Sequence, residues 1–111
     1  MRIYTRSEFM KLPPGTIFSS GEPFAFRDLL VKGESWECDF VQSSLIGIES
    51  FDSEQHADRE YEMLEKGSSY PINKSFGREG LFDDKLLYLV YEDKDLVYLK
   101  NVISNSINKL P

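Results

Sequence analysis

The sequence predicts an α+β fold, in which a curled, barrel-like antiparallel sheet of four or five strands packs with two main helices. Between residues 16 and 48, short β-branched and aromatic segments alternate with turn-forming residues, a pattern typical of consecutive antiparallel strands. From residue 52, the apolar residues instead recur with the 3.6-residue period of a helix. A second helical pattern follows a last apolar strand at 86–91, so both main helices come after the meander.

The length and composition of the chain fit one folded unit. With 111 residues, of which 41% are hydrophobic and 14% aromatic, the chain can form one hydrophobic core and is short for two. We therefore expect a single domain spanning residues 1–111. Cys38 is the only cysteine, so an internal disulfide is not possible, and a lone thiol fits a reducing compartment.

A short helix is expected near the start of the chain. Thr5 and Glu8 have the spacing of a capping box, in which each side chain bonds to the backbone of the other residue. Phe9 and Leu12 then fall on one face of the helix. Pro13 ends it, because the residue before a proline is disfavoured in the α conformation.

Turn-forming residues divide the next segment into a meander. We expect strands at residues 16–18, 23–32, 36–40 and 45–48. A hairpin loop at 19–22 and a tight turn at 32–34 would separate the first three strands. The clearest alternation places Trp36, Cys38 and Phe40 on one face and acidic residues on the other, which indicates a half-buried strand.

The first main helix is expected at Asp52–Lys66. Asp52 is a favourable N-cap, Gln55 completes a capping-box spacing, and Gly67 is a favourable left-handed C-cap. We expect the helix to bury one apolar stripe, which consists of Ala57, Tyr61 and Leu64.

The second main helix is expected at Asp93–Lys109, after a strongly apolar strand at Leu86–Tyr91. Asp93 is the expected N-cap of this helix. Its apolar stripe consists of Leu96, Leu99, Ile103 and Ile107. We expect this stripe to cover a face of the sheet or to close one end of the barrel.

The charge of the chain argues against nucleic acid as a partner. The formal net charge is −6, and 13 basic residues are spread among 19 acidic ones, whereas phosphate binding requires clustered Lys and Arg. No apolar run approaches the ~20 residues of a membrane-spanning helix, and the first residues lack the apolar segment of a signal peptide. The sequence therefore predicts a cytoplasmic protein without a membrane segment.

The sequence also lacks the motifs that bind nucleotide phosphates, dinucleotides or calcium, so we predict no cofactor and no metal site. His56 is the only histidine, and its spacing from Asp52 and Glu60 places all three on one helix face. This arrangement leaves open a small hydrolase centred on His56, although a solvated surface histidine produces the same pattern more often.

The segment 68–84 shows no periodicity and is long for a connection within a compact domain, which is typical of functional loops. It combines apolar and basic side chains, and aromatic and Arg residues dominate binding hot spots. The candidate binding residues are Tyr70, Lys74, Phe76 and Arg78. The alternative is that the apolar side chains lie on the core and hold the loop down.

The predicted helix at 52–66 has a strongly acidic face. Carboxylates at roughly helical spacing could imitate a row of phosphates and bind a basic surface of another protein. The residues of this acidic face are Glu54, Asp58, Glu62 and Glu65. A solvated helix face is the simpler interpretation.

Two segments resemble parts of small uncharacterised proteins encoded by phages and prophages. The first is the opening Ile3–Phe18, and the second runs from Gly80–Asp84 through the strand at Leu86–Tyr91 to Leu96. The shared features are caps, turns and strands, so the resemblance supplies no catalytic residues. It implies a host-cell cytoplasmic setting and an accessory role, such as the binding of a host or phage protein.

These observations favour a non-catalytic protein that acts through contacts with another protein, as a phage or prophage accessory factor. Two alternatives remain open. One is a module that binds a small molecule or nucleotide through the 68–84 loop. The other is the hydrolase centred on His56.

Overall fold

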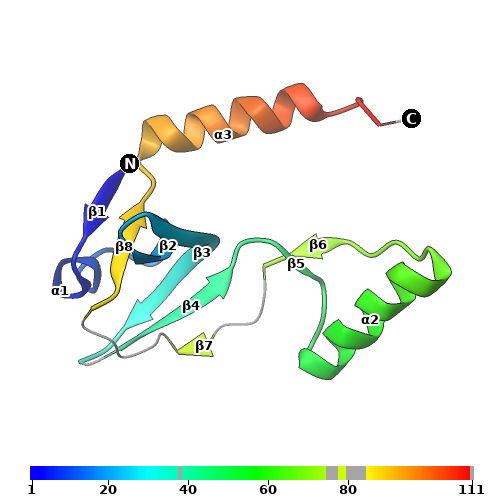
Figure 1. Ribbon diagram of the computed structural model, residues 1–111, viewed down its shortest axis with the longest axis horizontal. Helices are drawn as coiled ribbons and strands as arrows, with labels where there is room; N and C mark the ends of the chain where they lie inside the picture. Colours follow the sequence, from blue (N-terminus) through cyan, green and yellow to red (C-terminus); the bar gives the residue numbers. More distant parts are fainter. Residues whose placement is uncertain (38, 75–77, 80–84, 111) are drawn as a thin grey trace.

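A computed structural model describes residues 1–37, 39–74, 78–79 and 85–110 (Figure 1). The order of its elements is β1 (Arg2–Tyr4), α1 (Arg6–Phe9), β2 (Ile17–Glu22), β3 (Ala25–Ser35), β4 (Phe40–Ser44), β5 (Gly47–Ile48), α2 (Ser53–Lys66), β6 (Ile72–Asn73), β7 (Arg78–Glu79), β8 (Leu87–Val90) and α3 (Asp93–Ser106).

The main sheet is antiparallel, with the strand order β1-β8-β2-β3-β4-β7. The two-residue β7 forms one edge and β1 forms the other, so the sheet is open over the described residues. Strands β5 and β6 pair with each other in a separate ribbon. The predicted α+β class is confirmed, but the sheet is not closed over the described residues, so it fits the expected barrel-like shape only loosely. Strand β1 was not expected from the sequence.

The β2–β3 hairpin is longer than predicted. Residues 19–22, expected as a loop, continue β2, and Glu22 pairs with Ala25. The turn therefore consists of Pro23 and Phe24 alone. Gly21 permits this geometry, because a Cβ atom there would lie 2.2 Å from the Ala25 carbonyl oxygen.

The next turn also differs from the prediction. Residues 32–34 lie inside β3, and the reversal comes later, where Trp36 N donates to the Asp39 carbonyl at 2.9 Å. The strand predicted at 36–40 is therefore wrong over its described residues: Trp36 and Asp39 close the turn, and only Phe40 lies in β4. Cys38 lies outside the described residues.

The core lies between α1 and one face of the sheet. The ring of Phe9 stacks on Tyr88 with centroids 4.3 Å apart and lies 4.6 Å from Phe18 and 5.2 Å from Phe40. All four rings are at most 1% exposed. The predicted capping box of α1 is confirmed, with Thr5 N donating to Glu8 Oε1 at 3.0 Å. A single helical turn therefore delivers the central ring of the core.

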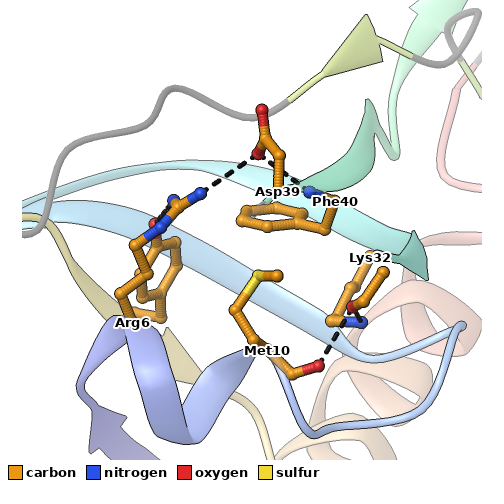
Figure 2. A network of polar contacts seen from close by, with 7 residues as sticks. Arg6, Met10, Lys32, Asp39 and Phe40 are labelled. Atoms are coloured by element: carbon orange, nitrogen blue, oxygen red, sulfur yellow. Dashed lines mark hydrogen bonds and ion pairs between the residues drawn. The ribbon is translucent and has the colours of Figure 1, made fainter. Parts of the chain in front are cut away.

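Buried charges adjoin this aromatic cluster (Figure 2). Arg6 Nη2 donates to Asp39 Oδ1 at 3.2 Å, and Arg6 Nη1 donates to the Tyr88 hydroxyl at 3.1 Å. The same Asp39 oxygen accepts from Phe40 N at 2.8 Å. Burial works against the charge on Arg6, but the hydrogen bonds with Tyr88 and Asp39 outweigh it and raise the pKa of the guanidinium.

Lys32 is a second buried cation, only 2% exposed. Its Nζ donates to Ser35 Oγ at 2.5 Å and to the Gly33 carbonyl at 3.2 Å, and Ser35 Oγ in turn donates to the Met10 carbonyl at 3.0 Å (Figure 2). Burial lowers the pKa of the Lys32 ammonium below its ordinary value of 10.5.

The two main helices do not pack on the sheet, contrary to the sequence-based prediction. Neither α2 nor α3 contains a buried residue, and Figure 1 shows α3 extending away from the sheet. The stripe expected to be buried on α2 is exposed, with Tyr61 at 60% and Leu64 at 79%. The N-cap of α3 is Glu92 and not the predicted Asp93. The helix ends at Ser106, earlier than the predicted end at Lys109. No helix in the described ranges is long and apolar enough to cross a bilayer.

Replacing Lys32 with Met should not destabilise the fold at pH 7, and we expect a gain of up to about 2 kcal/mol, since a desolvated charge is removed while the side-chain volume is kept. Lys32 has a lowered pKa in the folded state, so it opposes folding fully below that pKa, and this effect fades as pH rises towards 10.5. The difference between variant and wild type in urea denaturation should therefore shrink at alkaline pH. A clear loss of stability for Lys32→Met at pH 7 would contradict the prediction.

Replacing Phe24 with Gly should raise the free energy of unfolding by about 0.5–1 kcal/mol. Phe24 is 105% exposed and has a φ of 67°, at the turn position where glycine is usually preferred. Phe24→Ala is the matched control, because it removes the ring but keeps a Cβ at positive φ. Equal gains in melting temperature for the two variants would show that the backbone conformation is not the cause.

Candidate functional site

A peripheral lobe, formed by residues 45–74, contains α2 and the β5–β6 ribbon (Figure 1). All of these residues are described, and none of them is buried. The buried residues of the described chain instead lie between positions 6 and 43 and at positions 88 and 90. The lobe therefore has no core of its own, although it carries many apolar side chains.

Local interactions fix α2 at both ends. Asp52 Oδ1 accepts from Gln55 N at 2.8 Å, which confirms the predicted N-cap. The Gln55 side chain accepts from Phe51 N at 2.8 Å, one residue before the position that a capping box would use. Gly67 ends the helix with a φ of 69°, the left-handed C-cap that the sequence predicted.

Between α2 and the ribbon lies an apolar groove with a volume of ≈ 450 Å³. One wall comes from α2 and the other from β5, β6 and the residues beside them. The described lining consists of Ile46, Gly47, Ile48, His56, Glu60, Met63, Tyr70, Pro71 and Ile72. Ile46 is 63% exposed and Ile72 is 66% exposed, so the rim of the groove is apolar as well.

Tyr70 ties the start of the 68–84 segment to α2. Its hydroxyl donates to Glu62 Oε2, and the Arg59 guanidinium lies 4.8 Å from the centre of its ring. Arg59 also donates to the Glu49 carbonyl, so it connects the helix to the chain that follows β5. The hydrogen bond with Glu62 raises the pKa of the Tyr70 phenol.

The structure places the predicted loop residues in different settings. Tyr70 lines the groove, whereas Lys74 is exposed at the end of β6. Phe76 lies outside the described residues. The backbone of Arg78 belongs to β7 and pairs with Gln42, and its side chain is not described. The grouping of these four residues as one binding surface, and the anion or nucleotide site built on it, stay predictions.

Only part of the predicted acidic face of α2 is exposed to solvent. Glu54, Asp58 and Glu65 are exposed, while Glu62 is half-buried and holds Tyr70. Glu60 adds a further carboxylate at the groove itself. The groove therefore combines an apolar floor with an acidic helix.

His56 lies in the groove wall, where its Nε2 is 3.5 Å from Glu60 Oε2. Both side chains are well exposed, at 42% and 67%. The described lining contains no serine, threonine or cysteine beside this pair, and the described part of the chain has no cluster of metal ligands. The hydrolase centred on His56 stays an untested alternative.

Most residues that line the groove were not predicted as site residues from the sequence. Ile48 and Ile72 belong to short strands, and the strand pairing that brings them together was not predictable from periodicity. Met63 was not assigned to the apolar stripe of α2. The role of Met63 could have been inferred from the sequence, because the apolar residues of this helix spread over more than one narrow face.

Comparison of the chain with protein-family models, with curated proteins and with solved structures gives no match. The resemblance to phage and prophage proteins therefore stays an expectation. The candidate site depends on its geometry and chemistry alone.

Replacing Glu62 with Gln should lower the pKa of Tyr70 towards its ordinary value of 10.0, because a carboxylate stabilises the protonated phenol more than a neutral amide does. NMR titration of tyrosine ring carbons would measure this pKa. Glu65→Gln is the control, since Glu65 belongs to the same acidic face and Tyr70 bonds to Glu62. Unchanged titration of Tyr70 in Glu62→Gln would contradict the docking of residues 68–74 on α2.

Proposed function

We propose that the protein is a non-catalytic binding protein whose groove between α2 and the β5–β6 ribbon receives a segment of another protein. The observation that carries this proposal is the combination of an apolar groove with a lobe that has no buried residue. Apolar surface that is left exposed in this way marks interaction sites in soluble proteins. A bound segment would supply the packing that the lobe lacks.

The chemistry of the groove indicates the kind of segment that it binds. Ile48, Met63 and Ile72 offer contacts to apolar side chains. Glu60 is the carboxylate of the described lining, while the other exposed carboxylates of α2, Glu54, Asp58 and Glu65, lie on the side of the helix away from the groove and add to its negative charge. We therefore infer a partner segment in which apolar residues are interspersed with Lys or Arg, because complementary charge speeds association and rejects acidic competitors.

The phage-like resemblance and the lone Cys38 support an accessory role in the cytoplasm of a host cell. In that role, the protein would bind a host or phage protein and perform no chemistry of its own. The net charge of −6 fits a protein partner with a basic surface better than nucleic acid.

A peptide titration tests the groove directly. We expect a peptide of about twelve residues that alternates leucine with lysine to shift NMR signals of the groove residues. The same peptide with glutamate in place of lysine should bind at least about tenfold more weakly. Signals that move mainly outside the groove, or equal binding of both peptides, would refute the proposal.

Variants of the groove provide the matched control. Ile72→Gln and Met63→Gln should weaken binding of the leucine–lysine peptide, because each removes an apolar contact of the groove. Leu64→Gln alters the neighbouring helix residue, which is 79% exposed and does not line the groove, and should bind like wild type. Circular dichroism should show that all three variants keep α2. Equal loss of binding in Leu64→Gln would show that the peptide does not bind specifically in the groove.

A further inference from the structure

The wall of the groove contains one pair of titratable side chains that face each other. His56 Nε2 lies 3.5 Å from Glu60 Oε2, and the two residues are one helical turn apart on α2. Both side chains remain in contact with solvent, and His56 is the only histidine of the chain. A change in the charge of His56 therefore changes the charge of the groove, and it can be observed without interference from another imidazole.

In the described lining of the opposite wall, no charged side chain faces His56. The β5–β6 ribbon and the residues beside it line the groove with glycine, proline, isoleucine and one tyrosine, Tyr70. The Tyr70 hydroxyl donates to Glu62, and this hydrogen bond raises the pKa of the phenol. Tyr70 therefore stays neutral at the pH values at which histidine titrates.

The other charged neighbours of His56 on α2 are engaged elsewhere. Asp52, one turn before His56, uses its carboxylate to cap the helix. Arg59 is held against the chain beside the ribbon by a hydrogen bond to a backbone carbonyl and by a ring contact. Neither residue belongs to the described lining of the groove, so Glu60 is the one carboxylate of this lining.

The charge of this lining depends on the protonation of His56. While the imidazole is neutral, the Glu60 carboxylate can receive a lysine or arginine of a bound segment. Protonation adds a positive charge, which repels this cation and pairs with Glu60. A docked segment would also cover the imidazole, and burial disfavours its charged form. All three effects weaken the binding of a basic segment at acidic pH.

We propose that protonation of His56 controls the groove, so that a basic, apolar segment binds well when His56 is neutral and more weakly when it is protonated. The inference rests on the proposed function, because it describes the regulation of the same site. Histidine side chains ordinarily titrate near about pH 6.5, so the change falls between neutral and mildly acidic conditions. An exposed ion pair contributes little, and we therefore expect about a three- to fivefold difference in affinity.

Peptide titrations at about pH 7.5 and about pH 5.5 test this control. The dissociation constant of the leucine–lysine peptide for wild type should rise about three- to fivefold at the lower pH. His56→Gln keeps a polar side chain but cannot take up a proton, so its dissociation constant should be nearly the same at both pH values. Circular dichroism of wild type and His56→Gln at both pH values should show that α2 is retained.

Other groups of the chain do not titrate strongly in this range. Carboxyl groups ordinarily titrate below it, and thiols and lysine amines titrate above it. Hydrogen bonds with Asp95 and Glu92 keep the pKa of the Met1 amino group above 8.0. A difference between wild type and His56→Gln can therefore be assigned to the imidazole.

The outcomes separate this inference from the proposed function. Wild type that binds the peptide in the groove at the higher pH and loses no affinity at the lower pH would overturn the control by His56, and the proposed function would stand. An equal loss of affinity in wild type and His56→Gln would have the same consequence. If the peptide does not bind at the higher pH, the proposed function fails, and the inference fails with it.

Two carboxylate variants test the role of Glu60. Glu60→Gln removes the charge with which His56 pairs, so binding at the higher pH should weaken and the pH response should fall at least about twofold. Asp58→Asn is the matched control, because Asp58 is exposed on the same helix and outside the described lining. It should keep the full pH response. A full pH response in Glu60→Gln would overturn the proposed mechanism, because His56 would then act without Glu60.

Discussion

The fold depends on one contact, the insertion of Phe9 from a single helical turn into the sheet. Its ring touches aromatic residues of three strands, β2, β4 and β8, which are distant in sequence. Arg6 begins the same helical turn that ends at Phe9, so this turn also places a buried cation against Asp39. Removing one partner of such a pair would leave an uncompensated buried charge, so the position of α1 fixes both the apolar and the polar parts of the core.

Concentrating the core in this way leaves the outer parts of the molecule without buried residues. The lobe of residues 45–74 and helix α3 extend from the sheet, and local caps and hydrogen bonds define their shape. The two parts differ in charge, because α2 is rich in carboxylates while α3 has none after its first turn. The proposed binding of a basic partner thus belongs to the α2 side of the molecule.

Most local signals in the sequence predicted local structure correctly, although the N-cap of α3 is Glu92 and not Asp93. The capping box at Thr5, the N-cap at Asp52 and the C-cap at Gly67 are all present, because each depends only on neighbouring residues. The turns of the meander were misplaced, since the position of a reversal depends on strand pairing across the sheet, as at Glu22 and Ala25. The apolar stripes of α2 and α3 were read as core, because periodicity identifies an amphipathic helix but not what covers it.

The position of β8 has a consequence for biosynthesis. This late strand pairs with both β1 and β2, and it supplies Tyr88 to the aromatic cluster. Until residue 90 has left the ribosome, β1 has no neighbour in the sheet and Phe9 has no ring to stack on. Strands β2, β3 and β4 can pair with one another before that point, whereas the pairing of β1 and the completion of the aromatic cluster wait for β8.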